Sequence, residues 1–190
     1  MYKRQLITIA TTGDATDFGD LSHGGAYRGG LASSTRGIFA NAQGDATLDY
    51  VTISSQGGAA DFGEAYSNHM GGSTFNSSTR GFRAGGSDPS LSTPHTSNIM
   101  GLIIASTGSF FDAGDLTIVG TYQNGASSPT RGIIFGGTTP SAVYNNIDVF
   151  TMASGGNAIK FGELTIARKY ADTSSNTIRG LAAGGSPSNN

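Results

Sequence analysis

Short stretches in which apolar and polar residues alternate run through the whole chain, separated by turns rich in Gly, Ser and Asn. In residues 147–153 (IDVFTMA), apolar side chains recur against polar neighbours, which is the period of a strand with one buried face. Residues 131–135 (RGIIF) form a shorter apolar run that ends in Gly-Gly. The pattern predicts an all-β protein built from many strands of about five residues.

The pattern repeats four times along the chain. An Arg-Gly pair opens one apolar run in each repeat, at Arg36, Arg80, Arg131 and Arg179, and a turn glycine marks each repeat as well, at Gly13, Gly57, Gly108 and Gly156. Both sets are spaced by 44, 51 and 48 residues, so the length differences must lie in loops. Four short strands at a period in the forties are typical of a β-propeller blade.

The units resemble the kelch repeat. The resemblance is carried by three diglycines, by phenylalanines in the place of the kelch tryptophan, by strand-three aromatics and by one arginine: Gly85-Gly86, Gly136-Gly137, Gly184-Gly185, Phe18, Phe62, Phe161, Tyr50, Phe150 and Arg168. The chain departs from kelch in having no Trp, in Asn41-Ala42 at the first diglycine and in Ala113 at the third aromatic. The resemblance implies a kelch-like β-propeller and little about chemistry.

The repeats divide one domain, residues 1–190, into blades. Full units cover approximately residues 24–66, 68–118 and 119–168, and a closing blade combines 1–22 with 169–185. The chain is expected to begin in a third strand, Gln5–Ala10, and to end just after a second strand. We therefore predict four blades of four short antiparallel strands, closed by strands from both termini, because closure removes open sheet edges.

The innermost strands of the blades are predicted in segments of small residues, at 24–34, 69–78 and 120–128, with loops as the alternative interpretation. Small side chains allow backbones to approach each other near a narrow axis.

Composition excludes several function classes. Charged residues make up only 13% of the chain, with a net charge of −2, so a basic nucleic-acid interface is not expected. The chain has no cysteine, which excludes disulfides and thiolate chemistry. No apolar run is long enough for membrane insertion, and no signal peptide is visible.

The repeated arginines and phenylalanines each allow two interpretations. The arginines could line a channel for an anion, or pair with loop carbonyls or with the fourth-strand carboxylates Asp20, Glu64, Asp115 and Glu163. The phenylalanines could form a platform for sugars, or pack between blades. The equal number of repeated acids and bases favours the structural interpretation for the arginines, and recurrence at one blade position favours it for the phenylalanines.

Motifs for metal binding and catalysis are missing from the sequence. His23, His69 and His95 have no ligands at metal-binding spacing, and the repeat turns lack the acidic density of a calcium loop. No nucleophile elbow and no phosphate-binding loop is found. We expect no catalytic residue, no metal and no cofactor, although an enzyme on a propeller is kept as a third hypothesis.

The loops between the second and third strands vary most, at 42–47, 87–98 and 138–146. Ligands of repeat proteins bind where loops vary over a constant scaffold. The best candidates for ligand contact are the hydrogen-bonding and aromatic residues of these loops: His95, Asn98, Tyr144 and Asn145.

A second resemblance lies in the amino-acid sequence of the repeats. Residues 11–21 (TTGDATDFGDL), 33–40 (SSTRGIFA) and 77–86 (SSTRGFRAGG) resemble repeats in tail-fibre and other virion proteins of tailed bacteriophages, notably cyanophages. This implies a non-catalytic binding or structural module, such as a tail-fibre or receptor-binding propeller, that recognises a glycan or a protein surface and possibly other virion proteins. The alternative is a non-viral extracellular interaction or assembly scaffold resembling a lectin-like propeller.

Overall fold

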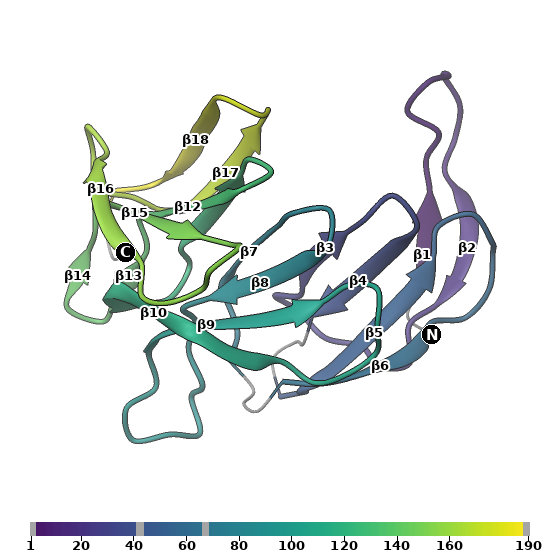
Figure 1. Ribbon diagram of the computed structural model, residues 1–190, viewed down its shortest axis with the longest axis horizontal. Helices are drawn as coiled ribbons and strands as arrows, with labels where there is room; N and C mark the ends of the chain where they lie inside the picture. Colours follow the sequence, from purple (N-terminus) through teal and green to yellow (C-terminus); the bar gives the residue numbers. More distant parts are fainter. Residues whose placement is uncertain (1–2, 41–43, 66–68, 188–190) are drawn as a thin grey trace.

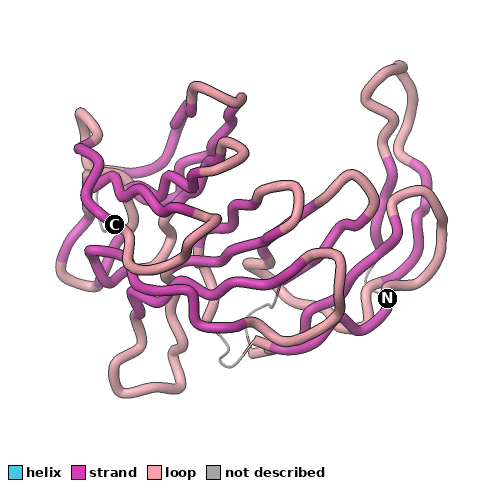
Figure 2. The backbone as a smooth tube through the Cα atoms, in the orientation of Figure 1, coloured by secondary structure: helices cyan, strands magenta, loops and turns pink. Residues whose placement is uncertain are grey.

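The computed structural model describes residues 3–40, 44–65 and 69–187, and its regular structure in these ranges is antiparallel β-strand (Figures 1 and 2). The predicted all-β class is confirmed. Within these ranges, the chain forms no helix that is long and apolar enough to cross a membrane.

Three four-stranded sheets form the body of the protein. Sheet I contains β3 (Gly29–Ala32), β4 (Arg36–Ala40), β5 (Thr47–Thr52) and β6 (Ala60–Glu64). Sheet II contains β7 (Ser73–Asn76), β8 (Arg80–Ala84), β9 (Thr96–Ile103) and β10 (Phe111–Gly120). Sheet III contains β11 (Asn124–Ser127), β12 (Arg131–Phe135), β15 (Asn146–Thr151) and β16 (Ile159–Glu163).

Three two-stranded sheets complete the structure. The N-terminal hairpin pairs β1 (Lys3–Leu6) with β2 (Thr16–Asp20), and the C-terminal hairpin pairs β17 (Lys169–Ser175) with β18 (Gly180–Ser186). A small hairpin of β13 (Thr138–Thr139) and β14 (Ala142–Val143) is inserted between the second and third strands of sheet III.

Successive sheets lie side by side along an arc. Within each sheet the strands follow one another in chain order, and the first strands of neighbouring sheets are in contact: β3 with β7, β7 with β11, and β11 with β17. The two terminal hairpins lie at opposite ends of the molecule (Figure 1).

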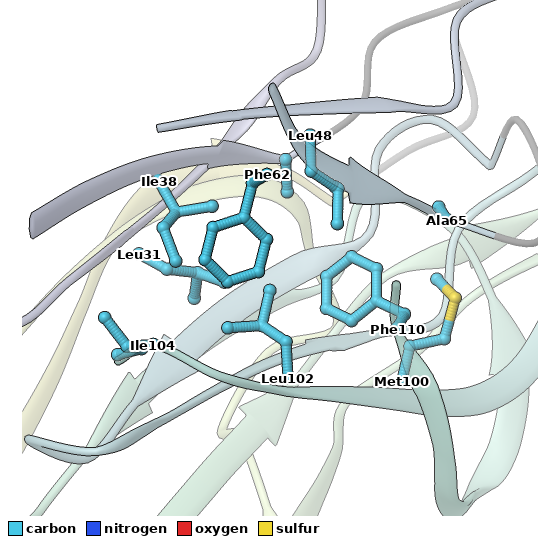
Figure 3. Close-up of a cluster of buried hydrophobic side chains, with 10 residues drawn as sticks. Leu31, Ile38, Leu48, Phe62, Ala65, Met100, Leu102, Ile104 and Phe110 are labelled. Carbon is cyan, nitrogen blue, oxygen red and sulfur yellow. The ribbon is translucent and has the colours of Figure 1, made fainter. Parts of the chain in front are cut away.

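The hydrophobic core lies between the sheets. One buried cluster joins Ile38 and Phe62 of sheet I to Leu102 and Phe110 of sheet II, whose side chains point toward one another (Figure 3). A second cluster joins sheets II and III in the same way. Fully burying one such side chain contributes about 1.5–3 kcal/mol, so these interfaces supply much of the stability.

The predicted closing blade is not confirmed. The expected two strands are present at each terminus, but β1–β2 and β17–β18 form two separate sheets. A strand count gives the number of terminal strands, whereas closure depends on the angle between successive sheets, which their packing sets.

Two predicted strand positions were wrong. The first strand covers Lys3–Leu6 rather than Gln5–Ala10, because its pairing with β2 ends at Leu6 and the following residues form the turn. The repeat pattern also predicts a strand at Phe161–Arg168, and this strand is β16 at Ile159–Glu163, because Ile159 already pairs with Val149. The predicted innermost segments contain β3, β7 and β11, which are only four residues long.

Replacing Phe62 with Ala should destabilise the protein by about 3–5 kcal/mol, because the ring is 2% exposed within the interface between sheets I and II. Denaturant unfolding monitored by circular dichroism measures the loss. Phe161→Ala is the matched control, since Phe161 has the same repeat position but is 61% exposed. Equal losses for the two variants would contradict this description of the core.

Candidate functional site

One end of the sheets carries both the linkers between sheets and the variable loops. Because the strands are antiparallel, the loop from the second to the third strand lies at the same end as the linker from one sheet to the next. The contacts agree, since Met70 in a linker pairs with Ser87 in a loop and Thr121 pairs with Thr138. We call this end the linker face.

Three tyrosines gather on the linker face, next to the first strands. Tyr27 and Tyr122 stand two residues before β3 and β11, and Tyr170 is the second residue of β17. The ring centroids of Tyr27 and Tyr122 are 5.9 Å apart, and those of Tyr122 and Tyr170 are 4.4 Å apart. We call these three residues the tyrosine cluster.

The tyrosines occupy equivalent repeat positions, and the fourth equivalent is Gly71. Tyr27, Tyr122 and Tyr170 have φ values of 62°, 55° and 57°, and Gly71 has a φ of 66°. This left-handed conformation is unfavourable for a bulky residue. A Cβ atom on Gly71 would lie 2.8 Å from the Tyr122 ring, so glycine there leaves space for that ring to reach Tyr27.

Exposure differs within the tyrosine cluster. Tyr27 is 50% exposed and Tyr170 is 53% exposed, whereas Tyr122 between them is half-buried. Burial raises the pKa of Tyr122 to about 12, and the neighbouring Tyr170 and Tyr27 raise it further in the same direction. The Nζ atom of Lys169, itself buried, lies 5.4 Å from the Tyr170 ring centroid. The cluster therefore presents two accessible rings beside a buried cation.

A buried polar group lies beneath the loop at residues 87–98. Arg83 is fully buried, and burial lowers its pKa to about 10. Burial also lowers the pKa of His69, the Arg83 charge lowers it further, and Asp88 acts in the opposite direction. The loop thus has a buried base at Ser87 and Asp88, while residues 89–93 form an exposed tip.

The four residues predicted for ligand contact all lie on or near the linker face, and each makes local contacts. The backbone of His95 bridges to Ser87, and the backbone amide of Asn98 donates to the Thr96 hydroxyl at 3.1 Å. The Tyr144 hydroxyl lies 3.2 Å from that of Thr139, and the Asn145 amide donates to Glu163 at 3.2 Å. His95 and Asn98 belong to sheet II, whereas Tyr144 and Asn145 belong to sheet III.

The repeated arginines lie at the opposite end of the sheets. The Arg36 guanidinium donates to the carbonyls of Ile104 and Ala105 at 3.0 and 2.8 Å. The Arg80 guanidinium donates to the carbonyls of Met152 and Ala153 in the same way, at 3.2 and 2.8 Å. Arg36 and Arg80 therefore pair with loop carbonyls of the next sheet, which was one of the interpretations left open above.

A Ser-His-Asp group near the N-terminus has a structural arrangement. The Ser22 hydroxyl donates to Asp49 and lies 2.9 Å from Nδ1 of His23, so serine, not histidine, is the central residue. A catalytic triad needs histidine between the other two groups. Thr117 and Asp148 repeat the same clamp two units later, with the hydroxyl donating at 2.6 Å. In the described ranges, no group of three His, Asp or Glu side chains could hold a metal ion.

Comparisons with known proteins bear on the fold alone. No protein-family model and no curated protein matches the chain. The solved structure of YjhT superposes on 93% of this chain with a TM-score of 0.74 and 12% sequence identity, and the chain spans 66% of the length of that structure. At this identity, the similarity shows that the two proteins share an all-β fold.

Tyr122 should ionise late, with its transition near pH 12. The pKa in the folded state is raised above its ordinary value of 10.0. Between pH 10 and pH 12 the unfolded chain therefore loses this proton while the folded chain retains it, so the free energy of unfolding falls over that range. Absorbance titration of phenolate measures the transition, and Tyr122→Phe should remove it. A Tyr122→Phe titration with the late transition intact would contradict the assignment.

Proposed function

We propose that the protein is a non-catalytic binding module, built as an arc of kelch-like β-propeller blades, that recognises a glycan with its tyrosine cluster. In this proposal, sheets I, II and III are blades and the two terminal hairpins are half-blades. The support for blades is the repeat, the strand order within each sheet and the contact between successive first strands.

The strained conformation of the three tyrosines carries the binding proposal. Each left-handed bulky residue costs of order 1–3 kcal/mol, and such strain clusters at sites where geometry serves function. Gly71 adopts the same conformation without this cost, so folding alone does not require tyrosine at the position. The accessible rings of Tyr27 and Tyr170 therefore have a use that packing does not explain.

The chemistry of the cluster suits a sugar. A tyrosine ring offers a flat apolar surface and a hydroxyl group, which match the C–H face and the hydroxyl groups of a pyranose. With a pKa of about 12, the Tyr122 hydroxyl is protonated at physiological pH, as an ordinary tyrosine is, and can donate a hydrogen bond. The exposed tip at residues 89–93 and the small β13–β14 hairpin lie on the same face and could extend the contact to a longer glycan.

The proposed biological setting, a phage virion, is based on the amino-acid sequence of the repeats. Their resemblance to virion proteins of tailed bacteriophages supports a tail-fibre or receptor-binding role in a virion, where other virion proteins would be partners. A non-viral extracellular scaffold with lectin-like binding is the alternative setting. Both use the same glycan site, so detection of the protein in purified virions separates them.

The double variant Tyr27→Gly/Tyr170→Gly should lose glycan binding by more than about tenfold, because truncating an aromatic hot spot costs about 2 kcal/mol or more. The fold should tolerate the change, since relief of left-handed strain by about 1–2 kcal/mol offsets the flexibility that glycine adds, about 0.5–1 kcal/mol. A glycan array followed by titration calorimetry on the best hit measures binding, and the melting temperature reports the fold.

Phe111→Ala is the matched control, because Phe111 is an aromatic residue of β10 that is 42% exposed outside the tyrosine cluster. It should bind like the wild-type protein. An array without hits, or unchanged affinity in the double tyrosine variant, would refute the proposed site.

A further inference from the structure

The two interfaces between full sheets are copies of one another. In each, six side chains of one sheet form a socket that packs against four apolar side chains of the next sheet. Two of the four occupy equivalent repeat positions at the end of the third strand and in the turn after it, and the other two are Met100 and Phe110 in one interface and Ile134 and Ala158 in the other. The socket of sheet I is formed by Leu31, Ile38, Ala40, Leu48, Phe62 and Ala65, and it receives Leu102 and Ile104. The socket of sheet II is formed by Phe75, Phe82, Ala84, Ile99, Ala113 and Leu116, and it receives Phe150 and Met152.

Sheet III carries a third socket, which is a cavity. The equivalent side chains line a cavity of about 610 Å³: Ala126, Ile133, Phe135, Ile147, Phe161 and Leu164. Among the described residues, the C-terminal hairpin stands beside it, with Ile178 88% exposed and Leu181 68% exposed. That hairpin provides the first two strands of a sheet, whereas Leu102, Ile104, Phe150 and Met152 of the other two interfaces come from third strands and the turns that follow them.

The matching side chains are exposed at the other end of the molecule. By the repeat spacing, Ile7 and Ile9 are equivalent to Leu102 and Ile104 and to Phe150 and Met152. Those four residues are each 1% exposed, whereas Ile7 is 64% exposed and Ile9 is 99% exposed. The N-terminal hairpin thus presents the two side chains that the third socket lacks.

Backbone hydrogen bonds repeat at the interfaces as well. Gly57 donates to the Phe18 carbonyl at 3.0 Å, Gly108 to that of Phe62 at 2.7 Å, and Gly156 to that of Ala113 at 2.8 Å. The next members of the series are the Gly13 amide and the Phe161 carbonyl. Gly13 lies in the turn of the N-terminal hairpin, and Phe161 lies in β16 of sheet III.

The fourth-strand glycines lie close to the backbone of the next sheet everywhere except in sheet III. A Cβ atom on Gly19, Gly63 or Gly114 would lie closer than 3.0 Å to a carbonyl oxygen of the next sheet. A Cβ atom on Gly162, the equivalent residue of sheet III, would have no described atom within 4 Å.

The terminal surfaces are also complementary in charge. The fourth strands of the other sheets carry an aspartate where sheet III has Lys160: Asp17, Asp61 and Asp112. The turn of the N-terminal hairpin carries Asp14 where the other turns have an uncharged residue: Gly58, Ser109 and Asn157. Lys160 pairs with Glu163 at 2.6 Å. The side chains of Ser109 and Asn157 accept hydrogen bonds from the backbone amides of Glu64 and Asp115, which are the equivalents of Glu163. A contact between sheet III and the N-terminal hairpin would therefore place Asp14 beside the Lys160–Glu163 pair.

We propose that the third socket binds the N-terminal hairpin of a second copy of this chain, with Ile7 and Ile9 in the cavity and Asp14 near Lys160. The two hairpins lie at opposite ends of the arc, so the N-terminal hairpin does not reach the third socket of its own chain (Figure 1). The contact is head-to-tail, and the rotation between copies decides between a closed ring and an open chain of copies. This inference does not depend on the glycan site.

The wild-type chain should show a mass that rises with concentration in analytical ultracentrifugation. The variant Ile7→Asp/Ile9→Asp loses the inserted side chains, and Phe161→Asp blocks the socket. All three substituted residues are exposed, so each variant should fold normally and remain a monomer. An equimolar mixture of the two variants should form a heterodimer, because it restores one intact pair of surfaces.

A pair of glycine variants tests the close approach. Gly162→Ala should weaken self-association at least about tenfold without changing the melting temperature of the dilute chain. Gly58→Ala is its control, because Ser109 and Asn157 show that a side chain is accommodated at that position. A wild-type chain that is monomeric at all concentrations, or a variant mixture that stays monomeric, would overturn the proposal.

Discussion

Packing between successive sheets is the interaction on which the rest of this structure depends. A single four-stranded sheet of this chain has too few apolar residues to bury a face alone, and each core cluster is shared by two sheets. The glycine of the fourth strand allows the backbone of the next sheet to approach, and the arginine at the start of the second strand donates to carbonyls of that sheet. The same contacts recur because each sheet buries its apolar face against the next sheet.

These packing contacts leave the linker face for the proposed glycan site. The side chains between sheets are occupied by packing, and the end with the arginines is occupied by pairing with carbonyls. The linker face is where the chain keeps three strained tyrosines although glycine occupies the fourth equivalent position. Stability favours glycine there, and this contrast is the observation on which the proposed glycan site rests.

Much of the fold could be predicted from the sequence, because a repeated pattern reports the same local structure several times. The spacing of the arginines placed β4, β8 and β12, and the diglycines placed the ends of β8 and β12. Whether the terminal hairpins meet could not be predicted, since this depends on small angles between sheets that no local pattern encodes.

The candidate site was only partly predictable. The choice of variable loops led to the end of the sheets that carries the proposed site, but residues that recur were assigned to packing, so the tyrosine cluster was not among the predicted contact residues. The signal was present in the sequence, since Tyr27, Tyr122 and Tyr170 share a repeat position with Gly71. A bulky residue in place of a turn glycine indicates a left-handed conformation and hence strain.

Amide hydrogen exchange by NMR at the four turn glycines tests the central claim of repeated interfaces most directly. In dilute protein, the amides of Gly57, Gly108 and Gly156 should be protected, because each donates to the neighbouring sheet, while that of Gly13 should exchange rapidly. At concentrations where copies associate, Gly13 should become protected too. Equal, rapid exchange at all four glycines, or protection of Gly13 in dilute protein, would contradict this account.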